Sequence, residues 1–361
     1  MVALIPNVEP VLSVEAITVL EPTARNILFP YAMEFKVVET CEFMLDQLEP
    51  LSVDFISFPL EPTEMNRLLP CVIPYNELAD APDVREVQLE PLSVAKILTS
   101  ICNKIKPDLW EFHLSYSDMD LDLSDYFKTK FESDFVVHAP ELFAGSHLMD
   151  LATPDQSYRE ESLKETQRVI DITRELKKFF PKTKKPMIVA NIGGFTMDKS
   201  LDESIIPSYY EQFSKSLEEL DMDGIELIPQ TMAPFPWHFG GQRYQNMFVK
   251  IDEITEWATK LNLRMCFDVS HTQLTCNHYK LDFYDFARKI APFTAHLHLG
   301  DAKGVNGEGL QVGDGDIDFD RLGAILKEGC PNASFIPEIW QGHKNRGEGF
   351  WVALNKLEEY F

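Results

Sequence analysis

The chain has 361 residues, with 58 acidic residues against 33 basic ones and a formal net charge of −25 at pH 7. A composition of 45% hydrophobic and 25% charged residues is typical of a folded globular protein and excludes an intrinsically disordered chain. Lys and Arg form no cluster along the sequence, so the charge also argues against a surface that binds nucleic acid.

Signals for targeting and for disulfide formation are missing from the sequence. There is no run of about 18 uncharged apolar residues, and the opening MVALIPNVEP lacks the basic and apolar regions of a signal peptide. We therefore expect a cytoplasmic protein without a membrane partner. Its six cysteines are scattered without CxxC spacing, which favours free thiols over disulfides or a zinc site.

The first 84 residues differ in composition from the rest. They hold 14 acidic and 3 basic residues and ten of the 23 prolines, whereas all 17 glycines lie beyond residue 144. The hexapeptide LEPLSV occurs at residues 48–53 and again at 89–94, with a variant from residue 8. Because Pro interrupts helices and Val, Ile and Phe alternate with polar residues, we predict a small β-rich domain of two repeats over 1–84. It would serve as a scaffold or bind a ligand, and its repeats would pack on each other, on the second domain or on another subunit of a homo-oligomer.

From residue 85 to 361, short apolar strands alternate with amphipathic helical segments. This alternation predicts parallel strands joined by helical crossovers. Eight strands in about 275 residues fit an α/β TIM (β/α)8 barrel better than a doubly wound sheet, because no early strand is followed by GxGxxG. The predicted strands are 87–89, 109–116, 135–138, 187–191, 224–228, 265–268, 295–298 and 334–339, and helices are expected at 93–105 and 160–179.

Ionisable residues gather where these strands end, and a TIM barrel places its chemistry at the carboxyl ends of its strands. Glu226, Asp268, His298 and Glu338 come from the fifth to eighth strands, which are neighbours around the barrel, so their side chains can converge on one ion. Three carboxylates and one imidazole suit Mn²⁺, Mg²⁺ or Co²⁺ and would also accept Zn²⁺. Other polar residues at strand ends are His138, Asn191, His271, His296, Asp301 and His343.

Four strings extend this pattern to a known family. FVVHAPE, CFDVSH, HLHLGDAKGVNGEGLQVGDG and the Glu of FIPEIWQGH resemble the xylose isomerase-like TIM-barrel superfamily. That superfamily contains ketose 3-epimerases, sugar-phosphate isomerases/epimerases, inosose dehydratases and endonuclease IV. The resemblance covers residues 85–361. It implies a metal-dependent isomerase or epimerase whose partner is a small sugar or sugar derivative.

The ketose 3-epimerase branch holds one divalent metal ion with Glu, Asp, His and Glu. Glu226, Asp268, His298 and Glu338 match that metal-binding set one for one. The resemblance implies that Glu226 and Glu338 are the catalytic residues and stand on opposite faces of the substrate. One removes a carbon-bound proton and the other returns a proton to a metal-stabilised enediolate.

Four further residues are candidates for substrate binding. His138 and His271 would orient the substrate or fix a neighbouring loop. Lys303 would bind a phosphate or acid group or remain solvated, and Trp237 would stack on a sugar face or pack in the core. The glycine-rich residues 300–315 would close over a substrate or form a solvated turn.

Other functions within this superfamily stay open. Endonuclease IV shares the HAP, DxxH and HLxDAK strings, but one of its metal-binding histidines falls on Asn191 and its DxH pair has no match in 304–315. Its trinuclear site would be incomplete, so AP-site cleavage is not expected. A lyase or hydrolase resembling inosose dehydratases is an alternative, as is a non-catalytic barrel acting as an assembly or sensor subunit. The Arg that follows the seventh strand in the epimerases is replaced by Gly304, which leaves the sugar unspecified.

Overall fold

The computed structural model describes residues 108–238, 241–342 and 344–360. The predicted repeat domain, the predicted strand at 87–89 and the predicted helix at 93–105 lie outside these ranges. Three of the six cysteines, Cys266, Cys276 and Cys330, lie inside them, and all three are free and buried. No helix in the described part of the chain is both long enough and apolar enough to cross a membrane.

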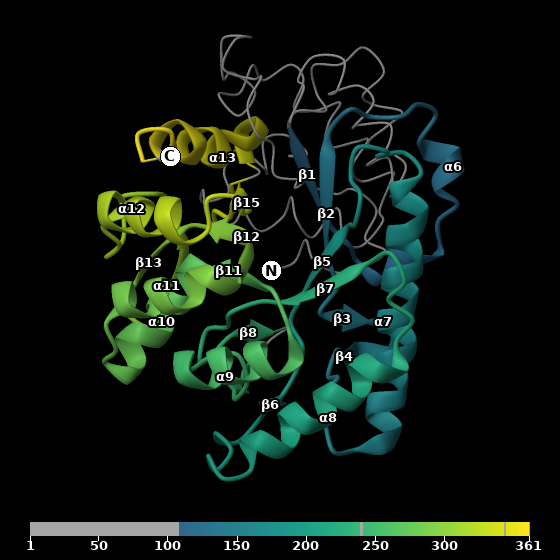
Figure 1. Cartoon of the computed structure of the whole chain (residues 1–361), viewed down its shortest axis with the longest axis horizontal. Helices are drawn as coiled ribbons and strands as arrows, with labels where there is room; N and C mark the ends of the chain where they lie inside the picture. Colours follow the sequence, from purple (N-terminus) through teal and green to yellow (C-terminus); the bar gives the residue numbers. More distant parts are fainter. Residues whose placement is uncertain (1–107, 239–240, 343, 361) are drawn as a thin grey trace, which may run out of the picture.

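Seven parallel strands of the described residues form the inner wall of the fold (Figure 1). They pair in the orders β1-β2-β5-β7 and β11-β12-β15, and a parallel bridge from Gln230 to Cys266 joins the two sheets. Each strand thus lies beside the next one in the chain, which confirms the predicted TIM barrel and seven of its eight predicted strands. The bounds are β1 Leu109–His113, β2 Asp134–His138, β5 Met187–Ala190, β7 Glu226–Pro229, β11 Met265–Asp268, β12 Thr294–Leu299 and β15 Ser334–Pro337.

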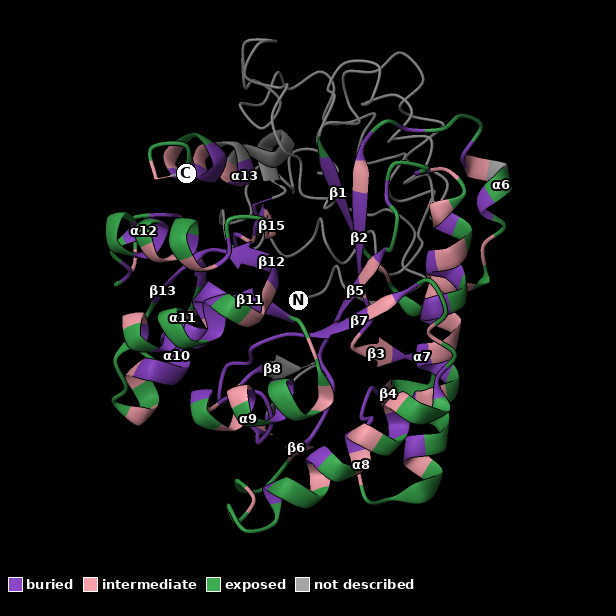
Figure 2. Ribbon diagram, in the orientation of Figure 1, coloured by how far each residue is buried: buried purple, intermediate pink, exposed green. Residues whose placement is uncertain are grey.

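Helices connect these strands and cover the outside of the wall. Figure 2 shows the strands mostly buried and the outer faces of the helices exposed. The predicted helix at 160–179 is confirmed and begins slightly earlier, where the Asp155 carboxylate accepts the Tyr158 N–H at 3.1 Å and caps the first turn. The helices are α6 Leu123–Tyr126, α7 Gln156–Lys177, α8 Ile206–Glu219, α9 Ile251–Leu261, α10 Val269–Tyr279, α11 Phe283–Ile290, α12 Phe319–Gly329 and α13 Lys344–Leu357.

Short elements elaborate the loops that follow the carboxyl ends of the strands. They form four antiparallel pairs, β3-β4, β6-β10, β8-β9 and β13-β14. Their bounds are β3 Leu142–Phe143, β4 His147–Leu148, β6 Phe195–Thr196, β8 Trp237–His238, β9 Gly241–Gln242, β10 Tyr244–Gln245, β13 Asp301–Lys303 and β14 Gly307–Leu310. Three 3-10 helices complete the described fold, η5 Tyr116–Asp120, η6 Ala144–Ser146 and η7 Ala291–Phe293.

Alternate residues of each strand face the helices or the barrel interior. In β1, Trp110 and Phe112 join the large core between strands and helices, whereas Leu109 faces the other way. An apolar interior layer takes one residue from each of six strands, and its members are Leu109, Val136, Val189, Ile228, Cys266 and Ile336. This layer is a cluster distinct from the large core between strands and helices.

Candidate functional site

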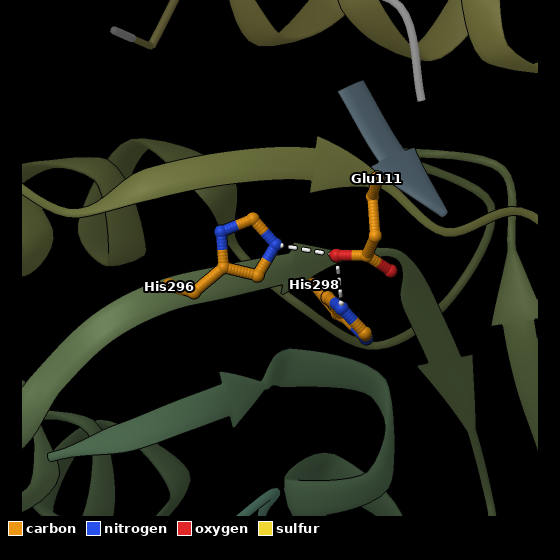
Figure 3. A group of neighbouring side chains, drawn as sticks. All are labelled: Glu111, His296 and His298. Carbon is orange, nitrogen blue, oxygen red and sulfur yellow. Dashed lines mark hydrogen bonds and ion pairs between the residues drawn. The ribbon is translucent and has the colours of Figure 1, made fainter. Parts of the chain in front are cut away.

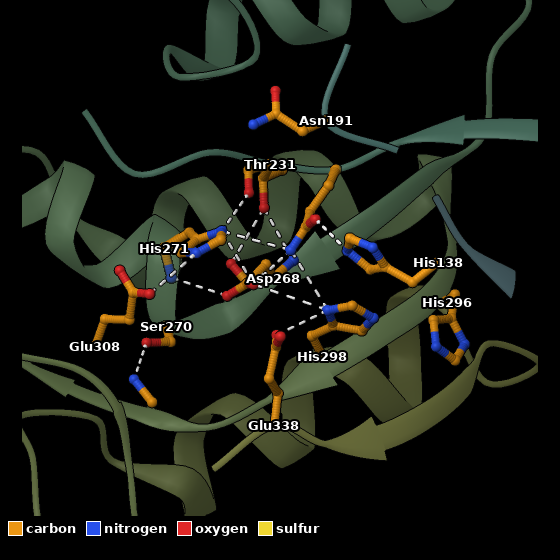
Figure 4. Close-up of polar contacts among 12 residues, drawn as sticks. His138, Asn191, Thr231, Asp268, Ser270, His271, His296, His298, Glu308 and Glu338 are labelled. Carbon is orange, nitrogen blue, oxygen red and sulfur yellow. Dashed lines mark hydrogen bonds and ion pairs between the residues drawn. The ribbon is translucent and has the colours of Figure 1, made fainter. Parts of the chain in front are cut away.

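A polar layer lies directly above the apolar layer, on the carboxyl side of the barrel. Two residues beyond each member of the apolar layer, the strand or the residue that follows it carries a polar side chain: Glu111, His138, Asn191, Gln230, Asp268 and Glu338. His298 of β12 joins them, because it is in register with Asp268 of β11. Side chains two residues apart on a strand point the same way. Figure 4 shows His138, Asp268, His298 and Glu338 of this layer grouped together.

Asp268, His298 and Glu338 form the centre of this layer. His298 Nδ1 lies 2.8 Å from Glu338 Oε2 and 3.9 Å from Asp268 Oδ2. The side chains of Asp268 and His298 are buried, whereas that of Glu338 is 39% exposed. The structure therefore brings together three of the four predicted metal ligands and leaves one carboxylate accessible to a substrate.

The local chain path places His271 beside Asp268. Asp268 ends β11 and caps α10, because its Oδ1 accepts the backbone N–H of His271 at 2.8 Å. The Nδ1 of the His271 ring then lies 3.0 Å from Asp268 Oδ2, while its Nε2 faces Glu308 Oε1 at 3.9 Å. The DVSH string thus predicts both the start of a helix and the position of a histidine at the site.

Glu226 does not join the other three predicted ligands. It is the first residue of β7, on the amino side of the apolar layer, and its carboxylate accepts hydrogen bonds from Arg264 Nε at 2.7 Å and Nη2 at 2.6 Å. The bond from Arg264 lowers the pKa of Glu226. The structure therefore does not bring Glu226 to the other three predicted ligands, because the carboxyl end of this strand is Pro229 and the polar residue beyond it is Gln230.

Gln230 occupies the place that was predicted for Glu226. Its Nε2 donates to Asp268 Oδ2 at 2.7 Å and lies 3.4 Å from His298 Nδ1. Its Oε1 lies 3.2 Å from His138 Nε2, which connects His138 to the centre of the site. An amide can donate a hydrogen bond or ligate a cation through oxygen, but it cannot take up a proton from carbon.

Burial and charge oppose one another within this site. Burial raises the pKa of Asp268; the Glu338 carboxylate raises it further, and His271 opposes both. Burial would also raise the pKa of Glu338, but the charge of His298 holds it well below its usual range. Burial would lower the pKa of His298, but Cys266 and the neighbouring carboxylates together raise it. Asp268 and Glu338 thus share the His298 ring, and Asp268 also faces the His271 ring at 3.0 Å.

The donor set fits a divalent cation. Ligand atoms of Asp268, His298 and Glu338 all lie within 4.8 Å of one another. Among the described residues, no Lys or Arg forms an ion pair with either carboxylate. Their ring partners are His271 and His298, so an entering cation would displace imidazole protons and not a permanent charge. Two carboxylate oxygens and one imidazole nitrogen suit Mn²⁺, Mg²⁺, Co²⁺ or Zn²⁺.

A family model described as xylose isomerase-like TIM barrel matches residues 102–358. The chain belongs to this family. Among solved structures, D-psicose 3-epimerase in the presence of D-fructose is 13% identical, with a TM-score of 0.50 over 82% of this chain and 99% of that one. A D-tagatose 3-epimerase-like protein is 20% identical, with a TM-score of 0.48 over 70% and 88% of the two chains.

Endonuclease IV from Thermus thermophilus is also similar to this barrel. It is 15% identical, with a TM-score of 0.45 over 73% of this chain and 93% of that one. At these identities the likeness to solved structures shows the fold alone. No curated protein matches the chain significantly. What this xylose isomerase-like barrel does must therefore be argued from its own residues.

The described contacts join neither of the other two predicted substrate-binding residues, Lys303 and Trp237, to the centre of the site. Lys303 is exposed in the β13-β14 hairpin, and no described contact joins its ammonium group to the site. The backbone of Trp237 lies in β8, but its side chain is outside the described set, so sugar stacking stays a prediction. Asn191 is engaged by its own loop, because its Oδ1 accepts the Gly193 N–H at 3.2 Å. His343 lies outside the described residues.

Sequence reasoning missed Gln230, Glu111 and His113 in this barrel, although the strands carry a signal for each. In FVVH and MCFD the polar residue follows the apolar run, and in ELIPQ the residue in that place is Gln230, not Glu226. In LWEFH, Glu111 and His113 alternate with Trp110 and Phe112, as interior residues of a strand do. Strand direction and alternation together would have selected all three.

Proposed function

We propose that this xylose isomerase-like barrel is a divalent-metal-dependent enzyme that moves a proton beside the carbonyl group of a sugar or sugar derivative. Asp268, His298 and Glu338 would hold the ion. A bound divalent cation supplies positive charge next to a developing oxyanion, which lowers the barrier to removing a proton from the adjacent carbon. The observation that carries the proposal is the part-exposed Glu338 carboxylate beside two buried ligands.

Glu338 is the group that would take the proton from carbon and return it. Its carboxylate is ionised, because the charge of His298 holds its pKa well below the usual range against the effect of burial. His271 is 15% exposed beside the buried Asp268, so it would donate a hydrogen bond to a substrate hydroxyl group. His138 reaches the site through Gln230 and would orient it.

An amide, Gln230, stands where a second carboxylate was predicted, and this difference bears on the type of reaction. Inverting one carbon requires proton transfer on both of its faces, and hence two acid-base groups. Moving a proton between neighbouring carbons on one face requires only one. With Glu338 on one side of the site and Gln230 on the other, the arrangement favours aldose–ketose isomerisation over epimerisation.

Gln230 would contribute a ligand to the ion by rotating its side-chain amide so that the oxygen and the nitrogen exchange places. His138 Nδ1 lies 3.0 Å from the carbonyl oxygen of Ala139, which can only accept, so this nitrogen carries the proton. Burial lowers the pKa of His138, and the Nε2 of a neutral His138 is an acceptor. An amide turned over would donate its N–H to His138 Nε2 and face Asp268 and His298 with its oxygen, as a fourth donor toward the cation.

Nuclear magnetic resonance in D₂O tests the proposal directly. The full chain, supplied with Mn²⁺, Mg²⁺, Co²⁺ or Zn²⁺, is incubated with aldoses and ketoses, both free and phosphorylated. We expect aldose–ketose interconversion that falls about 100- to 10,000-fold in Glu338→Gln. Glu226→Gln is the matched control, since it removes a carboxylate from the same barrel at the opposite end, and it should keep its activity.

Two outcomes would count against this function. Inversion at a single carbon without aldose formation would require a second proton-transfer group opposite Glu338. Absence of conversion and of deuterium incorporation across the panel, with metal bound, would contradict proton transfer altogether. Loss of water from the substrate would instead identify the lyase alternative.

A further inference from the structure

A second polar group is built around Glu111 of the polar layer and shares His298 with the site. Glu111 Oε2 lies 2.7 Å from His296 Nε2 and 3.1 Å from His298 Nε2 (Figure 3). Its other oxygen, Oε1, lies 2.5 Å from His113 Nε2. The side chains of Glu111, His296 and His298 have no exposed surface. A carboxylate so fully removed from water must be compensated by its partners, and here the described partners are all histidines.

His298 belongs to both polar groups. Its Nε2 faces Glu111, whereas its Nδ1 faces Glu338 at 2.8 Å and Asp268 at 3.9 Å. An ionised carboxylate only accepts hydrogen bonds, so Glu111 requires a proton on Nε2 of the ring. Nδ1 is then the nitrogen left to face a cation, and the ring cannot turn without breaking the Glu111 contact.

We propose that Glu111 is a positioning residue for the metal site: it holds the Nε2–H of His298 and thereby aims Nδ1 at Asp268 and Glu338. This inference rests on the proposed metal-dependent function. Hydrogen bonds to the second nitrogen of a ligating histidine fix its tautomer and its orientation, and their loss costs about 10- to 100-fold in metal affinity.

His296 and His113 contact Glu111 and would not themselves hold the ion. Both nitrogens of His296 are engaged, Nε2 by Glu111 and Nδ1 by Ser334 Oγ at 2.7 Å. His113 covers the other oxygen of Glu111 and stacks on His138, with ring centroids 4.7 Å apart and planes 13° apart. Glu111, His296 and His298 are residue types that bind metals, but a cation between them would take the Nε2 of His298 and leave the proton of the ring on Nδ1, the nitrogen that faces Glu338 and Asp268.

Metal titration of Glu111→Gln in the full chain tests the inference. We expect Zn²⁺ and Mn²⁺ affinity to fall about 10- to 100-fold, measured by calorimetry, with the circular dichroism spectrum unchanged. Glu165→Gln is the matched control, because Glu165 is a buried carboxylate paired with Arg168 at 2.7 Å on α7. His296→Gln keeps the contact between Glu111 and His298, so it should change affinity by less than about threefold.

Nitrogen-15 resonances of the histidines in the zinc-loaded wild type provide a measurement that needs no variant. We expect zinc on Nδ1 of His298 and a proton on Nε2. Zinc on Nε2, or an unchanged affinity in a folded Glu111→Gln, would overturn the inference. Two bound equivalents, one of them lost in His296→Gln, would make Glu111, His296 and His298 a second metal site and would also overturn the inference. A wild type that binds no metal contradicts the proposed function, which distinguishes the two failures.

Discussion

The two ends of the barrel use carboxylates in opposite ways. At the amino end, Glu226 is held by two hydrogen bonds from the Arg264 guanidinium. At the carboxyl end, Asp268 and Glu338 face histidines and an amide. A guanidinium stays charged at every working pH, whereas an imidazole can give up its proton. Asp268 and Glu338 can therefore exchange an imidazole proton for a metal ion, whereas Glu226 cannot exchange Arg264. The kind of cationic group beside a carboxylate thus determines whether it is available as a metal ligand.

Removing one carboxylate from each end tests this contrast most strongly. We expect Asp268→Asn to weaken metal binding more than 100-fold, about 3 kcal/mol, because a charged ligand becomes neutral. Glu226→Gln should leave the affinity within about twofold of the wild type, since its carboxylate lies on the far side of the apolar layer. Calorimetric titration with Mn²⁺ measures both, and a similar loss in the two variants would remove the distinction between the ends.

Converting Gln230 to Glu sharpens the contrast in the other direction. The new carboxylate would face Asp268 Oδ2, which is 2.7 Å from the present amide nitrogen. Without metal, we expect the free energy of unfolding to fall by about 2 kcal/mol, because like charges would be buried together. A bound divalent ion should restore this loss. Thermal unfolding with and without Mn²⁺ measures both effects, and a variant equally stable in the two conditions would contradict a cation at Gln230.

Asp150 represents a third kind of carboxylate, one that accepts hydrogen bonds from the backbone. Its Oδ1 accepts from Ala152 N and Gly194 N, both at 3.0 Å, and burial raises its pKa to about 6. A folded-state pKa above the unfolded value near 3.9 stabilises the protein at low pH, and this contribution is lost as pH rises through about 6. Glu226, whose pKa is lowered, has the opposite dependence.

Asp150→Asn should therefore stabilise the protein at pH 7 by about 1 to 2 kcal/mol and flatten the stability profile between about pH 4 and 6. The amide oxygen can still accept both backbone hydrogen bonds, so the change removes the charge without removing the contacts. Urea unfolding at several pH values checks this expectation. A variant no more stable than the wild type at pH 7, or a wild-type profile unchanged by the substitution, would contradict it.

The fold could be predicted because the strands repeat their pattern locally. Apolar runs such as FVVH and MCFD identify a parallel strand and its carboxyl end within a few residues, without knowledge of what lies beside them. The prediction chose Glu226 by residue type, whereas Gln230 is the residue that follows the apolar run of β7 and contacts Asp268. Asp268, His298 and Glu338 satisfy both criteria, and the structure brings them together.

Other parts of the site could not be read from local pattern. Glu111 and His298 are 187 residues apart, and only closure of the barrel places Oε2 of one against Nε2 of the other. Which ring nitrogen of His298 faces Asp268 depends on that contact, and no sequence motif encodes it. The role of Gln230 likewise depends on His138 and Asp268, which its side chain contacts on either side.

Asp268 ends a strand, starts a helix and faces the candidate ion with a single side chain. Its Oδ1 is committed to the first turn of α10, so any substitution that alters the donor toward the ion also alters the beginning of that helix. Gln230 and Glu338 begin no helix and carry no such second duty. At the proposed metal site, Gln230 and Glu338 can therefore be exchanged for other ligands without disturbing the start of a helix, whereas Asp268 cannot.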